Sequence, residues 1–475
     1  MVFSSTIFLF GFLPAVIIFY YALQLPGLKS FRNTALLLVS FIFYLYGAAG
    51  FVWFLIGSTT VDYLLGLLIE RDRRRKRLWL LLSVLLNIGL LAYFKYANFF
   101  VDELNIVFAR FGFTLIELQE VILPIGISFF TFKKLSYVLD VYQGKVSAQK
   151  NIVGFTLYVA IFPQLIAGPI MRYHDARDQL KQRRGTWDLF YDGIVRFCWG
   201  LAKKVMIADA CGRIADYMFA LDLELLDIKM AWLGAIAYTL QIYFDFSAYS
   251  DMAIGLGMLF GFKFPENFKR PYSAVSITDF WRRWHITLSR WFRDYLYIPL
   301  GGNQKGAGRT CLNLSIVFIL CGLWHGANWT FVLWGIFHGA LLILERISGI
   351  RNLPAPKYQT VRRIATLLLV ILGWVVFRSA NIFQAFEFLS RMFTITELPV
   401  SYELILVLNY RNVLFLMIAL TVFFMPRDFS GIQFLMDRKG PIPLFTGLLM
   451  ILLLLPYCAA MIIGGSNNPF IYYRF

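Results

Sequence analysis

Apolar runs long enough to cross a lipid bilayer recur from the first residues of the chain to the last, and they restrict its fold more than any other feature. A helix needs about 20 residues to cross a hydrocarbon core of about 30 Å. Lipid offers no hydrogen-bond partner to an open sheet edge, so helices are favoured. The sequence therefore predicts an all-α, polytopic transmembrane protein with about eleven spans or partial spans.

The composition agrees with a protein that uses the bilayer as its solvent. Of 475 residues, 59% are hydrophobic and 15% are charged, outside the balance of a water-soluble domain. The formal net charge of +17 lies in short loops between apolar runs, which indicates cytoplasmic anchoring and argues against nucleic acid as a partner. No repeat or soluble domain is visible, so we expect one membrane domain over residues 1–475. The five cysteines lack metal-ligand spacing and are predicted to be core thiols: Cys198, Cys211, Cys311, Cys321 and Cys458.

The distribution of basic residues predicts the orientation. The first run, Met1 to Leu23, lacks the basic start and cleavage pattern of a signal peptide, so we expect a first span that ends near Leu25-Pro26-Gly27. Basic residues follow it and recur in the block 70–77. Two runs separate these basic stretches: Thr34 to Tyr46 and Phe51 to Ile69. If both basic stretches are cytoplasmic, the N-terminus lies outside.

One run in the middle of the chain does not fit a simple span. Ile152 to Ile170 is long enough to cross, but Pro163, Gly168 and Pro169 break it and basic residues flank both ends. A re-entrant or broken helix is tolerated where it is buried in protein or lines a cavity, so we expect a central chamber. The other predicted spans are Leu78 to Phe94, Ala231 to Phe260, Cys311 to Leu344 (with a break), Ile364 to Phe377, Val413 to Phe424 and Leu444 to Ile463.

Four histidines are the main candidates for chemistry. His174 lies in a charged loop and is interpreted as incidental. His285 lies in the segment Ser276 to Leu300, where Ser276 and Asp279 form a predicted capping box and the periodicity predicts one helix in the cytoplasmic interface. His285 falls at the edge of the apolar stripe of that helix. Two interpretations stay open for it: a packed polar residue or a contact with lipid headgroups, or else a functional group that faces inward.

His325 stands within the apolar run CGLWHGANW. Twelve helical steps, or about 18 Å, separate it from Asn313, which predicts an imidazole near or beyond the bilayer midplane. The run is too long for one span, so we expect a break after His325, beside freed backbone groups that polarise a carbonyl. This setting favours a functional role over a core role. On a continuous helix His338 would lie about 220° around the axis from His325, so we interpret it as a structural hydrogen-bonding residue. Metal binding by the three histidines is a weak alternative.

Other polar residues interrupt the apolar sequence. Asp62, Asp245 and Asp251 either orient a histidine or line a proton path, or they bind neighbouring helices together. Both interpretations stay open. Arg378 is expected to snorkel toward the membrane interface.

At these residues the chain resembles the membrane-bound O-acyltransferase family, and within it the bacterial alginate O-acetyltransferase branch. The resemblance extends nearly from end to end. Its blocks are MVFSSTIFLFGFLP at the start, LPIGISFFTFKKLSYVLDVYQG at 123–144, FPQLIAGPI at 162–170, DFWRRWHITLSRWFRDYLYIPLGG at 279–302, GLWHGANWTFVLWGIFHG at 322–339 and the closing IYYRF.

The resemblance implies that His325 is the catalytic histidine and that His285 is the second conserved polar position. It implies a multi-pass protein of the bacterial inner membrane, with broken helices around a central funnel. There a cytoplasmic acetyl-CoA or other acyl thioester serves as donor substrate, without a bound cofactor. An extracytoplasmic acetyltransferase is the implied partner, and an exopolysaccharide of the alginate type is the implied final acceptor. The residues expected to contact substrate are Trp324, Asn328, Trp281, Arg282 and Arg283.

A thioester is already reactive, so a base, a positioning group and an oxyanion site suffice for acyl transfer. We expect His325 to take the proton of the acceptor hydroxyl and His285 to orient donor or acceptor. Basic residues from Lys263 to Arg309 either attract the phosphates of coenzyme A or anchor the chain. Three alternatives stay open: D-alanyl transfer to teichoic acids, a transporter or flippase, which the missing inverted repeat disfavours, and an acyl-enzyme on Cys321.

Overall fold

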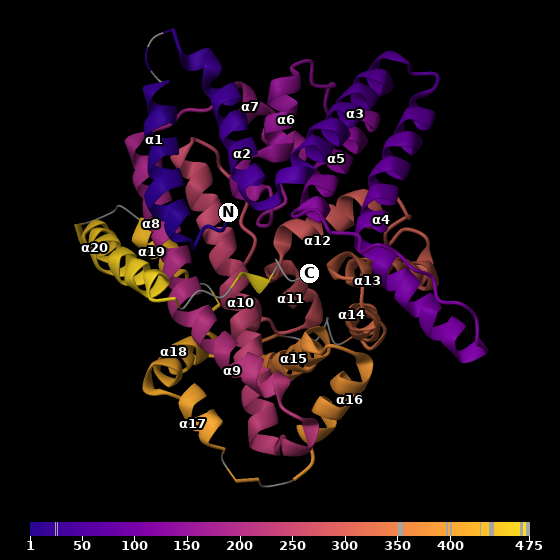
Figure 1. The fold of residues 1–475 in the computed structure, drawn as a ribbon, viewed down its shortest axis with the longest axis vertical. Helices are drawn as coiled ribbons and strands as arrows, with labels where there is room; N and C mark the ends of the chain where they lie inside the picture. Colours follow the sequence, from indigo (N-terminus) through magenta and orange to yellow (C-terminus); the bar gives the residue numbers. More distant parts are fainter. Residues whose placement is uncertain are drawn as a thin grey trace. The chain divides into compact units, whose positions relative to one another are not determined.

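The computed structural model describes residues 1–23, 25, 27–349, 355–395, 398–399, 401–427, 429–436, 441–465 and 469–471. Every regular element in these ranges is a helix, which confirms the predicted all-α class (Figure 1). Two sequence-based predictions fall partly on other residues: the end of the first span at Pro26, and Tyr472 to Phe475 of the closing block, lie outside the described residues.

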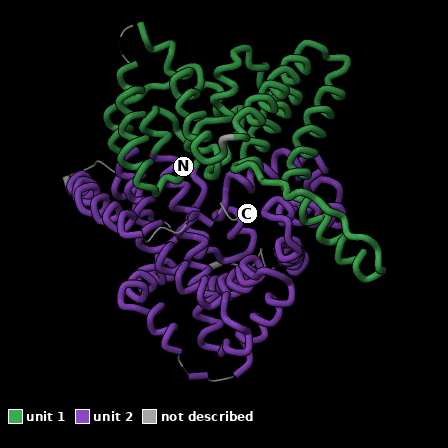
Figure 2. Tube along the Cα trace, in the orientation of Figure 1, with its two compact units in different colours: residues 1–191, 256–265 green, residues 192–255, 266–475 purple. Residues whose placement is uncertain are grey.

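The chain divides into two compact units, which Figure 2 colours separately. The first unit comprises residues 1–191 and 256–265, and the second comprises residues 192–255 and 266–475. The expectation of a single membrane domain stays a prediction. Each unit is described by itself below.

Seven helices in the described part of the chain are long and apolar enough to cross a membrane. They are α2 (Arg32–Ala48), α3 (Val52–Arg71), α4 (Lys76–Phe111), α13 (Gly306–His325), α14 (Trp329–Ile347), α15 (Ala355–Arg378) and α20 (Pro441–Ile463). Two shorter apolar helices, Ile7–Ala22 and Tyr410–Phe423, occupy the first predicted span and the one expected at Val413 to Phe424. The protein is therefore a multi-pass membrane protein, and the total of about eleven passes stays a prediction.

The first unit also contains α1 (Leu13–Ala22), α5 (Ile127–Tyr142), α6 (Ile152–Ala160) and α7 (Tyr173–Lys181). A buried carboxylate joins three of its helices. Asp62 on α3 accepts hydrogen bonds from Ser83 Oγ at 2.5 Å and Asn87 Nδ2 at 2.8 Å, both on α4. Lys134 Nζ on α5 lies 3.4 Å from the same carboxylate. These contacts bind helices together, which supports the structural interpretation of Asp62.

The broken segment in the first unit is confirmed. Helix α6 ends at Ala160, and a single 3-10 turn, Phe162–Gln164, follows within a buried stretch. Lys133 Nζ on α5 donates a hydrogen bond to the Tyr158 carbonyl oxygen at 3.1 Å, which satisfies one of the orphan carbonyls at this helix end. Gly126 lets the neighbouring turn approach, because a Cβ there would collide with the Leu165 carbonyl oxygen. The predicted funnel stays a prediction.

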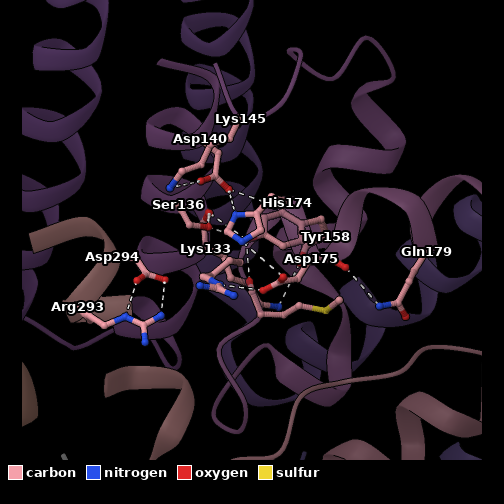
Figure 3. A network of polar contacts seen from close by, with 12 residues as sticks. Lys133, Ser136, Asp140, Lys145, Tyr158, His174, Asp175, Gln179, Arg293 and Asp294 are labelled. Carbon is pink, nitrogen blue, oxygen red and sulfur yellow. Dashed lines mark hydrogen bonds and ion pairs between the residues drawn. The ribbon is translucent and has the colours of Figure 1, made fainter. Parts of the chain in front are cut away.

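The interpretation of His174 as an incidental loop residue is wrong. It lies in α7, and its Nδ1 is 2.8 Å from Oδ2 of the fully buried Asp140 on α5. The His174 backbone N–H donates to the same oxygen at 3.1 Å, and Lys145 Nζ lies 3.9 Å from Oδ1 (Figure 3). The Asp140 carboxylate thus lies at the N-terminal turn of α7, where negative charge is favourable. Sequence position alone did not reveal this partner, which lies 34 residues earlier.

The second unit holds most of α8 (Trp187–Ala202) and of α10 (Ile228–Leu259), and the remaining elements listed here: α9 (Asp209–Ala220), α11 (Ile277–Arg283), α12 (Ile286–Phe292), α16 (Ile382–Arg391), α17 (Tyr402–Val407), α18 (Tyr410–Leu420) and α19 (Gly431–Met436). Glycines bring α8 and α10 together. A Cβ on Gly200 would lie 2.7 Å from the Ala248 carbonyl oxygen, and one on Gly255 would lie 2.6 Å from the Gly193 carbonyl oxygen. Neither contact leaves room for a side chain.

Buried ion pairs hold α10 within the second unit. Asp251 on α10 lies 2.9 Å from Arg196 Nη2 of α8 and 2.7 Å from Lys203 Nζ, which stands in the π-helical turn Lys203–Ala208. Arg196 also binds Glu266 at 2.6 Å. The cluster is charge-balanced, as burial of ions requires.

A second cluster surrounds Lys204, whose Nζ lies 2.6 Å from Asp245 and 2.8 Å from Asp209. The Ile471 backbone N–H donates to Asp245 Oδ2 at 2.9 Å, so the described end of the chain is bound to α10. Both aspartates of α10 therefore bind cations, which supports the structural interpretation. Arg378 Nη2 forms an ion pair with Asp216 at 2.7 Å, and the expectation that its side chain snorkels stays a prediction.

Candidate active site

The helix break predicted after His325 is present. Helix α13 ends at His325, and α14 begins at Trp329 after an extended Gly326. Asn328 caps α14, since its Oδ1 accepts a hydrogen bond from the Thr330 backbone N–H at 3.0 Å. His325 therefore stands at the C-terminal end of one membrane helix and directly before the N-terminal end of the next.

Two glycines allow α13 and α14 to pack at very short range beside this turn. A Cβ on Gly322 would collide with the Phe331 carbonyl oxygen, and a Cβ on Gly335 would collide with the Phe318 carbonyl oxygen. The two positions face each other, because that second Cβ would also lie 3.3 Å from the Gly322 Cα. The turn that carries His325 is thus fixed by backbone packing about one helical turn away.

Aromatic rings enclose the His325 imidazole, and the residue is 6% exposed. Its ring centroid lies 5.0 Å from that of Trp324, 5.1 Å from that of Trp334 on α14 and 5.2 Å from that of Phe377 on α15. All three contacts are edge-on, the geometry that aromatic pairs prefer. These rings from three helices restrict the rotation of the imidazole.

The predicted continuous helix from Ser276 to Leu300 is wrong, although its capping box is confirmed. Ser276 Oγ accepts a hydrogen bond from the Asp279 backbone N–H at 3.0 Å. Helix α11 then ends at Arg283, and His285 adopts φ 42° and ψ 53° before α12 begins. The physical reason is a tertiary contact: the preceding loop competes for the backbone, with Lys269 N–H donating to the Arg283 carbonyl oxygen at 2.9 Å.

This break places the His285 imidazole in the interior of the second unit, where it is fully buried. Its Nδ1 lies 3.1 Å from Asn267 Oδ1, and its ring centroid lies 4.7 Å from that of Phe246 on α10. The functional reading of an inward-facing His285 is therefore compatible with its position. Burial lowers the pKa of His285 to about 3, so the imidazole is neutral near pH 7.

One indole connects the two histidines predicted to be functional. The ring centroid of Trp324 lies 6.2 Å from that of His285 and 5.0 Å from that of His325. Residues that are 40 positions apart are thus neighbours of the same side chain. The structure brings His285, Trp324 and His325 together, which the sequence alone did not indicate.

The other residues expected to contact substrate are placed as follows. Trp281 is 8% exposed and packs edge-on against Phe318. Both ends of the Asn328 amide bind the protein, because Nδ2 also donates to the Ala380 carbonyl oxygen at 2.7 Å. Arg283 Nε forms an ion pair with Asp279 at 2.8 Å, whereas Arg282 is exposed. Their contacts with substrate stay predictions.

The interpretation of His338 as a hydrogen-bonding residue is wrong. Within the described ranges neither of its ring nitrogens has a hydrogen-bond partner, and it is fully buried. Aromatic rings surround it, among them Trp281 at 5.3 Å and Trp334 at 5.0 Å between centroids. Trp334 also contacts His325, at 5.1 Å between ring centroids, so one indole is a neighbour of both histidines.

Sequence reasoning missed three residues that build this site. Asn267 contacts His285, Trp334 contacts His325, and Glu345 on α14 accepts hydrogen bonds at 2.9 Å from the Thr278 backbone N–H and Oγ at the start of α11. No local periodicity links these residues to their partners. Trp334 occurs on the predicted span Cys311 to Leu344, and Glu345 directly follows that span. A large ring and a carboxylate beside an apolar run were the available signals.

Comparison with known proteins assigns the chain to a family. The family model for MBOAT, the membrane-bound O-acyltransferase family, matches residues 147–386, a range that includes His285 and His325. The chain belongs to this family. It is therefore an O-acyltransferase, and the resemblance read from the sequence is confirmed.

Several relatives of this acyltransferase carry names. A protein of Pseudomonas putida named "Probable alginate O-acetylase AlgI" is 43% identical over 498 residues, which cover 100% of both chains. A protein of the same name from Pseudomonas aeruginosa is 48% identical over 83% of this chain and 75% of its own. A "Peptidoglycan O-acetyltransferase" of Helicobacter pylori is 36% identical over 82% of this chain and 80% of its own.

Proposed function

We propose that this acyltransferase moves an acetyl group from a cytoplasmic thioester, with His325 as general base, for O-acetylation of an extracytoplasmic polysaccharide of the alginate type. The observation that carries the proposal is the position of His325 at the end of α13, enclosed by three aromatic rings and adjacent to a helix break. A buried histidine at such a break suits proton transfer near neutral pH.

The chemistry requires one base and one site for negative charge. In the proposed step, the neutral His325 takes the proton of the acceptor hydroxyl, and the resulting oxygen attacks the thioester carbonyl. The tetrahedral intermediate collapses, the carbon–sulfur bond breaks, and the thiolate leaves with the proton from His325. An ester and a thiol replace an alcohol and a thioester, so atoms and charge balance.

The break after His325 supports stabilisation of the oxyanion. Gly326 has an extended backbone, and the first turn of α14 follows with its partial positive charge. Backbone N–H groups at positions 326 and 327 are the proposed donors to the developing negative charge. They lie on the chain immediately after the base, so one turn supplies both functions.

His285 is proposed to orient a substrate, and the basic segment between Lys263 and Arg309 to attract the phosphates of coenzyme A. Ion pairs within the protein already occupy part of that segment: Arg283 binds Asp279, and Arg293 Nε binds Asp294 at 2.7 Å. The exposed Arg282 is the better candidate for a phosphate contact.

The names of the relatives support the acetyl group and a polysaccharide acceptor. Proteins named for alginate and for peptidoglycan O-acetylation match most of this chain, and alginate is the proposed polymer because its relatives are more similar. Transfer across the inner membrane would require an extracytoplasmic acetyltransferase as partner. Donor, direction, polymer and partner all belong to this proposal, and D-alanyl transfer is the alternative acyl chemistry.

The test supplies radiolabelled acetyl-CoA to membranes that contain the protein, together with a hydroxyl-bearing oligosaccharide. We expect label on the acceptor with the wild type, and none with His325→Ala or His325→Gln. The Cys311→Ser variant, a substitution at a partly exposed position of the same helix, controls for expression and handling. Transfer that survives His325→Ala would contradict the base assignment.

Two further outcomes separate the alternatives. Label that stays on the protein and is lost in Cys321→Ser indicates an acyl-enzyme, since Cys321 lies one helical turn before His325. D-alanine transfer in place of acetyl transfer indicates the teichoic acid reaction. Movement of an acyl-bearing substrate without chemistry indicates a transporter.

A further inference from the structure

Asn267 is the central partner of the break that carries His285. It is 1% exposed, and its backbone carbonyl oxygen accepts a hydrogen bond from the Ile286 N–H at 2.9 Å. Its side-chain Oδ1 accepts from Thr287 Oγ1 at 2.8 Å and lies 3.1 Å from His285 Nδ1. Its Nδ2 donates to Ser250 Oγ on α10 at 3.2 Å. One residue therefore holds the imidazole, the backbone beside it and the start of α12.

The surroundings decide which end of the Asn267 amide is oxygen. Oxygen and nitrogen of an amide have similar shapes, and their assignment follows from the hydrogen bonds that they make. The Thr287 backbone N–H lies 3.3 Å from the atom that faces His285. A backbone N–H only donates, so the atom that faces it is the oxygen.

The direction of the Asn267–His285 hydrogen bond follows from this assignment. Oδ1 of an amide carries no hydrogen, so His285 Nδ1 donates. A neutral imidazole has one N–H, and its other nitrogen then presents a lone pair. His285 in this setting carries its proton on Nδ1, and Nε2 is an acceptor.

The backbone conformation of His285 keeps the ring in this place. A residue other than glycine at φ 42° is uncommon, and it occurs where surrounding contacts impose it. Here the hydrogen bonds from Ile286 N–H to Asn267 and from Lys269 N–H to Arg283 fasten the break on both sides. Strained residues of this kind cluster at functional sites.

We propose that Asn267 is a positioning residue that holds His285 in the Nδ1–H tautomer, so that His285 accepts a hydrogen bond from an O–H or N–H group of a substrate. This inference rests on the proposed function and sharpens the role of His285. It assigns oxyanion stabilisation to other groups, because a thioester carbonyl offers no hydrogen to accept. The substrate group is either the hydroxyl of the acceptor or an amide N–H of the donor.

A direct test reads the tautomer without activity. The protein contains four histidines, so labelling them with nitrogen-15 gives a simple spectrum, and His285→Gln identifies the signal of this residue. At pH 7 we expect the Nδ1–H tautomer for wild-type His285. A signal of the Nε2–H tautomer, or of an imidazolium, would overturn the inference on the folded wild-type protein.

The kinetic test uses Asn267→Asp, which places a carboxylate beside Nδ1. Three uncharged residues contact His285 from α10, α13 and the preceding loop: Phe246, Trp324 and Asn267. The α10 aspartates are bound to lysines. A new carboxylate raises the pKa of the imidazole, and a charged imidazole offers a donor at Nε2 instead of an acceptor. We expect activity to fall by about tenfold or more at low pH and to recover at high pH.

A matched control separates this effect from simple destabilisation. Asn313→Ala removes another fully buried amide of the second unit, one that donates to the Gly302 carbonyl oxygen at 3.0 Å. We expect no change in the shape of its pH profile. A larger KM for acceptor in Asn267→Asp identifies the hydroxyl as the bound group, and a larger KM for donor identifies the amide N–H.

The outcomes distinguish the two proposals. If His325→Ala is inactive but Asn267→Asp has the wild-type pH profile, the inference about Asn267 is wrong and the proposed function stands. If His325→Ala keeps its activity, the base assignment in the proposed function is wrong, and the nitrogen-15 spectrum still decides the tautomer.

Discussion

The protonation of His285 differs between the folded and the unfolded protein. Its burial and its hydrogen bond to Asn267 make it a neutral group inside the protein. In an unfolded chain the same imidazole titrates near 6.5. The difference between the two states is a property that can be measured on the whole protein.

We expect acid to destabilise the protein through His285. Its folded-state pKa of about 3 lies below its unfolded value, so the unfolded state binds more protons between these two values. Stability therefore rises with pH through this window and is lost as pH falls from the unfolded value toward 3. Thermal unfolding in detergent at several pH values measures it, with a smaller acid loss expected in His285→Gln.

Parallel curves for wild type and His285→Gln would contradict this prediction.

The sequence predicted the helix break at His325 but not the one at His285, and the reason is physical. The position of His325 depends on local signals: an apolar run too long for one span and small residues after it. The break at His285 depends on hydrogen bonds from residues 267 and 269, which no helical periodicity encodes. His174 was misread for the same reason, since its partner Asp140 lies on another helix.

At the scale of elements, the α13–α14 pair packs too closely to accept a side chain at two of its glycines. Gly322 and Gly335 stand where each helix meets the backbone of the other. A methyl group at either position must separate the helices or distort them, and overpacking of this kind costs about 1–3 kcal/mol.

We expect Gly322→Ala and Gly335→Ala to lower acyl transfer at least tenfold, because separation of the helices shifts His325 at their turn. Gly308→Ala, on the same helix α13, is the matched control. A Cβ there meets nothing within 4 Å, and alanine is the better helix former, so activity should be unchanged. For each of the three variants, acetyl transfer, expression level and unfolding temperature are measured.

Wild-type activity in both tight-contact variants would show that the turn does not depend on this packing. A loss in Gly308→Ala equal to theirs would indicate a general effect of alanine in the helix.

The ion cluster around Asp251 is the second element-scale feature. Replacement of Arg196 by methionine leaves Glu266 without this partner and Asp251 with one cation instead of two. Breaking a buried pair typically costs about 3–5 kcal/mol. We expect a strongly lowered unfolding temperature for Arg196→Met, measured in detergent.

The control for this prediction is Arg177→Ala, which removes an exposed ion pair with Asp178 in α7. Exposed pairs contribute about 0–1 kcal/mol, so its unfolding temperature should stay near that of the wild type. Equal effects of the two variants would contradict the assignment of α10 stability to the buried cluster.

At the scale of the whole molecule, composition predicted the helical class and most long helices. The apolar runs at 34–46, 51–69 and 444–463 correspond to α2, α3 and α20. The ends of the helices were harder to predict. The predicted span Leu78 to Phe94 lies in the much longer α4, whose later turns carry polar residues. Hydropathy indicates which residues can face lipid, whereas a helix continues for as long as its backbone hydrogen bonds continue.

The orientation of the chain is testable by labelling. We expect Leu118→Cys, in the exposed stretch after α4, to react with a membrane-impermeant maleimide in intact spheroplasts. Arg74→Cys, in the basic turn between α3 and α4, should react after permeabilisation. The background is Cys311→Ser, since the other cysteines are buried. The reverse labelling pattern would place the N-terminus in the cytoplasm.

The α13–α14 turn also bears on how the protein is made. Its tightest contacts join residues that are 9 and 17 positions apart, Gly322 with Phe331 and Phe318 with Gly335, so closure of this hairpin costs little chain entropy. Both helices leave the ribosome in succession, and the hairpin can form while α15 is still being synthesised. The setting of His285 instead joins residues from α10 to α13. The proposed base is thus shaped early in biogenesis, and α15, which supplies Phe377, closes its surroundings later.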